Sequence, residues 1–311
     1  MEEVSTHLFI PTLRRVWSDY QVSRSLREAT VRNYNQRLHT YLGDWLDLPV
    51  DQISKDMVEK RHREINGNAM ANSTMRTLKS LLHYAARKYE TAGGEPVLKT
   101  NPVYRLSELR CWKKERRRQS IIRIQELRPW FSAVMSLENH TARDFFLLLL
   151  FTGMRKGEAL NLRWSHVNLA TGVITIPPDL TKTHEEYVIP LSDYVWVLLK
   201  VRSFYATADF VFPSTQKDRP LSGAFNSYST VAQRSGVKFS PHDLRRTFCT
   251  IGDELEIKSE VVKALVNHKT YDVTEGYTIR SVERLPRATQ RITDAILVQA
   301  GIRKTVLLRE S

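Results

Sequence analysis

The chain has 311 residues, of which 47 are Lys or Arg and 34 are Asp or Glu, so its formal net charge is +13. With 41% hydrophobic residues it is a globular chain long enough for two domains, and the basic excess favours a polyanionic partner, nucleic acid or an anionic membrane. The longest apolar run, residues 145–151, is far shorter than the roughly 20 residues of a spanning helix, so we expect no membrane segment, and we expect no secretory signal.

The N-terminal third of the chain is patterned as successive helices. Apolar residues recur at helical spacing over residues 31–46, with Thr30 as the expected N-cap, and again over residues 74–89. Ser54 is the expected N-cap of a helix over residues 54–65, and a shorter helix is expected over residues 8–20. We therefore predict a helical domain over residues 1–105.

A dense run of basic residues follows the helical pattern. We interpret residues 106–122 as an interdomain linker that lies on phosphates, with a solvated, flexible linker as the alternative, since most such runs are no more than that. The basic residues of this linker are Arg110, Lys113, Lys114, Arg116, Arg117 and Arg118.

Residues 123–311 combine helical patterns with a short stretch of β-sheet. Residues 173–176 and 186–189 predict a β-hairpin. Helices are expected over residues 124–135, 143–152, 194–205, 222–235, 242–254, 259–266 and 283–299. The predicted fold is mainly α, with a helical domain followed by a mixed α+β domain that contains a small β-sheet.

The two cysteines, Cys111 and Cys249, provide no disulfide framework, which is typical of a reducing cytoplasm. The spacing of the Cys, His and acidic residues does not indicate a zinc site. We therefore expect a cytoplasmic protein without a structural metal.

Some polar residues of the second domain are weak signals when taken one at a time. Arg155 follows an expected helix end at Gly153, where glycine permits a left-handed turn, but an ordinary ion pair with Glu158 explains it equally well. Lys182 lies in the predicted hairpin turn, where a lysine is usually exposed and has no special role. These residues gain significance only from those that follow.

His242 and Arg245 lie three residues apart at the start of a predicted helix, so both project from one face, where the helix N-terminus suits a phosphate. A capping histidine beside an ion-paired arginine explains the pair equally well. Tyr277 follows His268, and a tyrosine, with a pKa of about 10, attacks phosphorus only where cations stabilise the phenolate. Without a Gly-rich phosphate loop or an acidic metal pair, the pattern predicts phosphoryl transfer with no metal and no cofactor.

In this order the residues resemble the catalytic set of the tyrosine recombinases, or phage integrases. The resemblance rests on Arg155 within Thr-Gly-Met-Arg-x-Gly-Glu, on Lys182, on His242-x-x-Arg245, on His268 and on Tyr277. It extends from about residue 8 to the helix after the tyrosine. It implies a helical core-binding domain that clamps DNA ahead of a catalytic domain.

The resemblance implies a role for each residue at a scissile phosphodiester. Tyr277 attacks the phosphorus and leaves a 3′-phosphotyrosyl link with a free 5′-hydroxyl. Arg155 and Arg245 hold the non-bridging oxygens, because their planar forks suit the charge that develops there. Lys182 protonates the leaving 5′-oxygen.

The remaining members of the set have supporting roles by the same resemblance. His242 assists proton transfer at the tyrosine, His268 donates a hydrogen bond to the phosphate, and Glu158 orients the site. The chain departs from the family pattern at Asn267, where Gly is usual, and at Glu256, also a common Gly position. Asn tolerates the left-handed conformation, so we expect the turn before His268 to be retained.

Other tyrosines lie near the set. Tyr271 lacks the spacing from His268, and Tyr187 and Tyr194 flank the hairpin, where packing is the better interpretation. Many phage integrases also carry a small arm-binding domain ahead of the core-binding domain. Here the core-binding pattern begins almost at once, so either that domain is naturally absent or the chain has been shortened.

The resemblance implies a site-specific DNA recombinase that integrates or excises a mobile element. Its expected partners are double-stranded DNA at attachment or crossover sites, three further copies in a homotetramer, and accessory DNA-bending proteins, in the nucleoid of a bacterial cytoplasm. A type IB topoisomerase with a similar active site is the alternative within the same chemistry. A DNA-binding regulator that keeps the fold without the activity is the alternative from another class.

Overall fold

The computed structural model describes residues 10–115, 119–181, 184–214, 219–221, 225–268 and 280–302. The chain divides into two compact units, Met1–Arg117 and Arg118–Ser311, and each has its own hydrophobic core. Helices dominate both units and a small sheet lies in the second, which confirms the predicted fold class. None of the helices within the described residues has the length and apolar character needed to cross a membrane.

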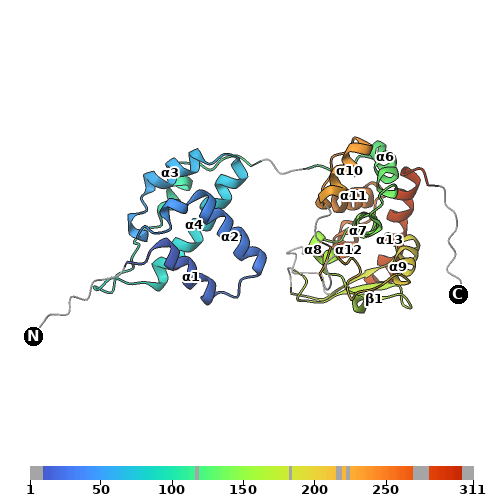
Figure 1. The fold of residues 1–311 in the computed structure, drawn as a ribbon, viewed down its shortest axis with the longest axis horizontal. Helices are drawn as coiled ribbons and strands as arrows, with labels where there is room; N and C mark the ends of the chain where they lie inside the picture. The colour runs from blue at the N-terminus through green and yellow to red at the C-terminus, as the bar shows by residue number, and fades with distance from the viewer. Residues whose placement is uncertain are drawn as a thin grey trace, which may run out of the picture. The chain divides into compact units, whose positions relative to one another are not determined.

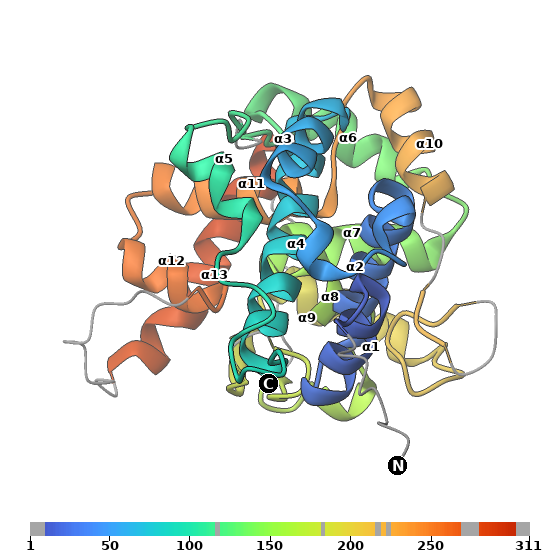
Figure 2. The ribbon, with the colours of Figure 1, turned by 90° about the vertical axis from the view of Figure 1, so that its left-hand side faces the viewer.

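The first unit is a bundle of four main helices. They are α1 (Leu13–Ser23), α2 (Glu28–Tyr41), α3 (Lys55–Glu64) and α4 (Asn68–Lys88), followed by the short α5 (Arg105–Glu108). In both Figure 1 and Figure 2, α4 lies among α1, α2 and α3, and it contacts each of them. Its apolar face buries Met75, Leu78 and Leu82 completely, so α4 is the central element of this core.

The observed N-termini of the helices in this unit agree only in part with the predicted N-caps. Ser54 caps α3 as predicted, because its hydroxyl accepts from the Met57 N–H at 3.2 Å. The prediction for Thr30 was wrong: α2 begins at Glu28, whose negative charge in the first turn suits the helix N-terminus, and Thr30 lies inside the helix. Thr12 caps α1, which begins later than expected because Pro11 precedes it in a non-helical segment.

The second unit packs its helices around α7 (His140–Thr152). The others are α6 (Ile124–Met135), α8 (Lys156–Leu160), α9 (Asp193–Ser203), α10 (Phe225–Ser235), α11 (Pro241–Glu254), α12 (Ser259–Leu265) and α13 (Arg280–Gln299). Every residue from 145 to 151 is buried, and α6, α9, α11 and α13 all contact α7. The longest apolar run of the sequence is therefore the central helix of a globular core.

The small sheet lies at the end of this unit opposite α10 (Figure 1). Its strands are β1 (Val167–Asn168), β2 (Val173–Ile176) and β3 (Tyr187–Pro190), antiparallel in the order β1-β2-β3. Ile176, the last residue of β2, pairs with Tyr187, the first residue of β3, which confirms the predicted hairpin. Strand β1 was not predicted, because two residues are too few to show an alternating pattern.

The division between the units falls within the predicted linker, and the described parts of that segment are held by their own units. Leu106 is fully buried in the first core, and the Lys113 and Lys114 carbonyls accept hydrogen bonds from α4. In the second unit, Ser120 donates to Asp243 and the Ile122 N–H donates to Thr247, both on α11.

Candidate active site

The candidate site begins at the turn where α7 ends. Gly153 adopts the left-handed conformation at φ +63°, as the sequence predicted, and it must be glycine for steric reasons as well. A Cβ atom there would lie 2.8 Å from Phe248 Cδ1 and 2.9 Å from Val266 Cγ1. The turn therefore brings the α7 terminus close to α11 and to the end of α12, and it places Arg155 at the start of α8.

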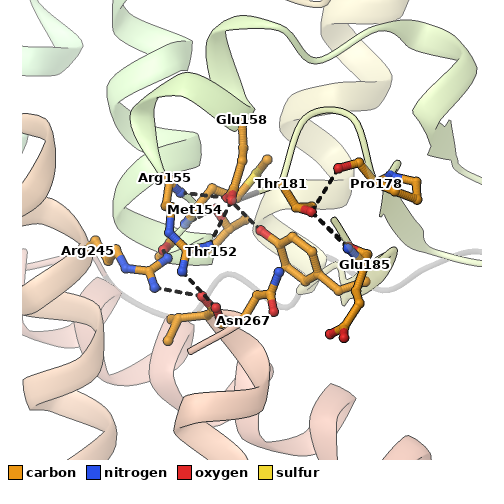
Figure 3. A network of polar contacts seen from close by, with 12 residues as sticks. Thr152, Met154, Arg155, Glu158, Pro178, Thr181, Glu185, Arg245 and Asn267 are labelled. Atoms are coloured by element: carbon orange, nitrogen blue, oxygen red, sulfur yellow. Dashed lines mark hydrogen bonds and ion pairs between the residues drawn. The ribbon is translucent and has the colours of Figure 1, made fainter. Parts of the chain in front are cut away.

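Arg155 forms the ion pair that the sequence allowed and, in addition, a hydrogen bond to a distant part of the chain. Its Nη1 donates to Glu158 Oε1 at 2.8 Å, and its backbone N–H donates to Glu158 Oε2 at 3.0 Å, so the local ion pair is present. Its Nη2 also donates to the Asn267 carbonyl oxygen at 2.7 Å, on the turn after α12 (Figure 3). The ion pair thus orients the guanidinium toward a distant segment of the chain.

Arg245 approaches the same turn from α11. It is 7% exposed, and its Nη1 and Nη2 donate to the carbonyl oxygens of Gly153 at 2.8 Å and Val266 at 2.6 Å. Burial lowers the pKa of its guanidinium, and the neighbouring Arg155 charge lowers it further. An arginine nevertheless stays charged near neutral pH, so two cations lie close together in a partly dehydrated site. Such a pair favours binding of an anion.

The turn after α12 bears the carbonyl groups that both arginines use. Asn267 has φ +47°, which confirms the expectation that asparagine retains the left-handed turn in place of glycine. The His268 N–H then donates to the Lys263 carbonyl oxygen at 2.9 Å, and the His268 side chain is exposed. Glu256, the other departure from the family pattern, also has a left-handed φ of +54°.

His242 is the second residue of α11 and is exposed, one helical turn before Arg245. Partial burial lowers the pKa of its imidazole, and the positive charges of Arg246 and Arg245 lower it further. The ring is therefore neutral near pH 7 and is able to accept a proton. Arg246 Nη1 lies 3.8 Å from Asp243 Oδ1.

Two polar residues near the hairpin were not predicted as parts of the site. The Tyr187 hydroxyl donates to Glu158 Oε2 at 2.7 Å, so the interpretation of Tyr187 as a packing residue is incomplete. The hydroxyl of the fully buried Thr181 shares its one hydrogen between the Pro178 and Glu185 carbonyl oxygens, each 3.0 Å away, and accepts from the Glu185 N–H (Figure 3). A signal for Thr181 was its position directly before Lys182, whereas no local pattern identified the partner of Tyr187.

The structure brings together Arg155, Glu158, Arg245 and the turn that bears His268, with His242 on the same helix as Arg245. Lys182 and Tyr277 lie outside the described residues, as do Tyr271, Arg116, Arg117 and Arg118. Within the part of the chain that the structure describes, no group of His, Cys, Asp or Glu side chains has the arrangement of a metal site.

The described basic residues of the predicted linker belong to the first unit. Lys113 Nζ donates to the carbonyl oxygens of Ile65 at 2.7 Å and Arg63 at 3.2 Å, at the end of α3. Arg110 and Lys114 are exposed. The ammonium group of Lys113 is thus engaged within the protein, while the other two side chains face solvent.

Comparison with known proteins places this site in a family. The model of the phage integrase family matches residues 122–284, which is more than half of the chain. The chain belongs to the phage integrase family. The match covers all the described site residues of the second unit, from Arg155 to His268.

Curated relatives extend the similarity into the first unit. Prophage integrase IntF of Escherichia coli (strain K12) is 29% identical over 281 residues, which cover 84% of this chain and 57% of IntF. Tyrosine recombinase XerA of Thermococcus onnurineus is 23% identical over 283 residues, which cover 88% of this chain and 92% of XerA. This chain spans less than two thirds of the length of the E. coli prophage integrases IntF and IntZ.

Solved structures share the fold of both units. A lambda integrase (75-356) dimer bound to a COC′ core site matches with a TM-score of 0.64 and 21% identity, covering 86% of this chain and 99% of that one. The Tn1549 transposon integrase in complex with circular intermediate DNA matches with a TM-score of 0.64 and 15% identity, covering 88% and 98%. At these identities the likeness shows the fold.

Proposed function

We propose that this protein is a site-specific DNA recombinase that cuts and rejoins DNA through a 3′-phosphotyrosyl intermediate to integrate or excise a mobile element. The observation that carries the proposal is the convergence of Arg155 and Arg245 on one left-handed turn, whose next residue is His268. Two oriented guanidinium groups, with the neutral His242 on the same helix as Arg245, form a site for a phosphodiester, and the relatives named as integrases and recombinases support that substrate.

The arginines would bind the non-bridging oxygens of the scissile phosphate. Each guanidinium has five N–H donors, so donors remain after the contacts to Glu158 and to the backbone carbonyl groups. Because these contacts hold both side chains before DNA arrives, little conformational entropy is lost on binding. His268 would add a hydrogen bond from the exposed side of the turn.

Proton transfer completes the proposed reaction. The Tyr277 oxygen attacks phosphorus and its proton passes to His242, while the bond from phosphorus to the 5′-oxygen breaks and Lys182 protonates that oxygen. Rejoining is the reverse, with a 5′-hydroxyl as the nucleophile. The phosphotyrosyl bond conserves the energy of the broken bond, so the scheme requires neither ATP nor a metal.

The first unit would clamp the duplex. A groove on its surface is lined by Arg24, Arg87, Lys88 and His83, together with Tyr20, Tyr84 and Ser80, and no acidic side chain lines it. This lining suits a phosphate backbone. We propose that the exposed linker residues Arg110 and Lys114 also bind the phosphate backbone, together with Arg116, Arg117 and Arg118.

The proposed assembly is a homotetramer on two duplexes at attachment or crossover sites, with accessory DNA-bending proteins, in the bacterial nucleoid. A lambda integrase tetramer bound to a Holliday junction, which matches this chain with a TM-score of 0.65 and 20% identity, supports the tetramer. The E. coli prophage integrases support a bacterial mobile element as the context.

A covalent trapping assay tests the proposal. Nicked duplexes that tile the DNA flanking the gene would be incubated with the full chain, since the nick lets the short product diffuse away and strands the phosphotyrosyl adduct. We expect an adduct with the wild type and with Tyr271→Phe, and none with Tyr277→Phe, although that variant still binds DNA. The reason is that the substitution removes only the nucleophilic oxygen.

The same assay separates the alternatives. Absence of any wild-type adduct across the tiled duplexes would support the regulator that binds without cutting. Adduct formation with relaxation of supercoiled DNA, but without strand exchange between two sites, would support the topoisomerase. An adduct that persists in Tyr277→Phe would assign the nucleophile to another residue.

A further inference from the structure

We infer that Tyr187 is a positioning residue of the active site, whose hydroxyl holds the Glu158 carboxylate and through it the Arg155 guanidinium. This inference rests on the proposed function and deepens it. Neither the family pattern of the sequence nor the alternation of β3 distinguishes Tyr187 from a residue that only packs. The hydrogen bond from its hydroxyl to Glu158 makes that distinction.

The Glu158 carboxylate is almost fully removed from water, since the residue is 2% exposed. A buried carboxylate requires several donors, because each missing hydrogen bond leaves charge without compensation. Glu158 has three described donors: the Arg155 N–H and the Tyr187 hydroxyl at Oε2, and Arg155 Nη1 at Oε1. Tyr187 is the one of these that does not belong to Arg155 itself.

That difference gives Tyr187 its effect on the arginine. If Arg155 were the only donor to the two Glu158 oxygens, the Glu158 carboxylate would be free to move together with the Arg155 side chain and would not orient it. The tyrosine hydroxyl attaches it to β3, which is paired with β2 and packed on the core through Ile189. The chain of contacts from β3 to Glu158 to Arg155 therefore ends at the Asn267 carbonyl oxygen, 2.7 Å from Nη2.

The chemistry of Tyr187 fits a fixed donor. Burial raises the pKa of its phenol, and the negative charge of Glu158 raises it further, so the hydroxyl remains protonated across the neutral range. The residue therefore donates to Glu158 at every pH at which the enzyme would operate. It is unsuited to act as a second nucleophile, because its phenolate is disfavoured.

Tyr187 also lies at the base of the loop between β2 and β3. Thr181 closes that loop through its contacts with Pro178 and Glu185, and Tyr187 joins the strand after the loop to α8. The same hydrogen bond therefore connects the start of β3 to Glu158, which in turn binds Arg155.

The test is a double-mutant cycle on the single-turnover rate of adduct formation, with the tiled nicked duplexes as the probe and the full chain in excess. In the wild-type background we expect Tyr187→Phe to slow the reaction about 10-fold, as the loss of a hydrogen bond to a charged group predicts. In an Arg155→Lys background, which lacks the planar fork, we expect less than about 2-fold further loss. DNA affinity should be unchanged in Tyr187→Phe.

Tyr228→Phe is the matched control. Tyr228 is a tyrosine of the same core whose hydroxyl is buried and has no hydrogen-bond partner within the described residues, so removing it should leave the rate unchanged in both backgrounds. A general loss of packing would slow both tyrosine variants alike, and a thermal scan of each would show it. The double-mutant cycle separates a packing defect from a positioning role. A packing defect slows the reaction in both backgrounds, whereas a positioning role is lost once Arg155 has been replaced.

The outcomes distinguish the inference from the proposed function. If the wild type forms no adduct, the recombinase proposal fails and this assignment fails with it. If the wild type reacts and Tyr187→Phe reacts equally fast, or loses the same factor in the Arg155→Lys background, the recombinase proposal stands and Tyr187 is not a positioning residue.

Discussion

Gly153 lies where the two arginines of the candidate site meet. Its carbonyl oxygen accepts from Arg245 Nη1, and its left-handed φ of +63° turns the chain so that Arg155 begins α8. Phe248 and Val266 pack against its Cα so closely that no side chain fits. The position therefore couples backbone conformation, core packing and the geometry of the site.

We expect Gly153→Ala to destabilise the second unit by about 2–4 kcal/mol, from the left-handed strain of an L-residue and the overpacking against Phe248. The midpoint of thermal unfolding should fall by about 5–15 °C, measured by circular dichroism on the full chain. Gly157→Ala is the control, because a Cβ there has no heavy atom within 4 Å, so its midpoint should stay the same or rise. Equal midpoints for the two variants would contradict the packing argument.

At the scale of single residues, the sequence indicated those features that depend on local chemistry. The left-handed turns at Gly153 and Asn267 follow from the intrinsic conformational preferences of glycine and asparagine. The burial of Arg245 and the hydrogen bond of Tyr187 could not be predicted, because each depends on partners that tertiary folding alone brings near. The order of residues along the chain indicated which side chains belong to the site, but not which hydrogen bonds hold them in place.

At the scale of elements, α4 holds the segment that leaves the first unit. Asn72, on α4, donates to the Lys113 carbonyl oxygen at 2.8 Å and to Glu115 Oε1 at 2.7 Å. Its Oδ1 accepts from the Lys113 N–H at 3.2 Å and from Nε2 of the buried His62 at 2.8 Å. One amide thus uses its full hydrogen-bonding capacity to attach residues 113–115 to the helices.

We expect Asn72→Ala to release this segment, because the buried His62 and both backbone groups of Lys113 would lose this partner at once, while Glu115 would keep only Arg76 among the described residues. Limited trypsin digestion followed by mass spectrometry should show cleavage after Lys113 and Lys114 about 10- to 100-fold faster than in the wild type.

The control for this experiment is Asn161→Ala in the second unit, which loses one exposed hydrogen bond to the Gly157 carbonyl oxygen and should leave that cleavage rate unchanged. Unchanged cleavage in Asn72→Ala would mean that the side chain does not hold the segment.

The same network explains where element prediction failed. The helix α4 begins at Asn68, earlier than the predicted residue 74, because the buried side chains of its first turn are the polar Asn72 and the small Ala71. A pattern based on apolar spacing does not detect such turns. Where the buried face is apolar, as in α6 over Ile124–Met135, the predicted and observed bounds coincide.

At the scale of the whole molecule, the net charge of +13 has several distinct uses. Arg155 and Arg245 are held in the candidate site, and Lys113 binds the carbonyl groups at the end of α3. Arg110 and Lys114 are exposed, and within the described residues neither forms an ion pair. Only charges of this last kind are free to displace counterions from a DNA backbone without rearrangement of the protein.

We therefore expect the double variant Arg110→Gln, Lys114→Gln to bind duplex DNA more weakly at every sequence. The slope of log affinity against log salt should become shallower by about 0.9 for each phosphate that the protein no longer neutralises, measured by fluorescence anisotropy from low to moderate salt. At saturating enzyme, adduct formation should keep its wild-type rate, because neither residue belongs to the catalytic set.

Lys258→Gln is the control, since Glu260 lies 3.9 Å from its ammonium group and already offsets the charge. A double variant with the wild-type salt slope would place the DNA-binding surface elsewhere, with the groove of the first unit as the next surface to alter.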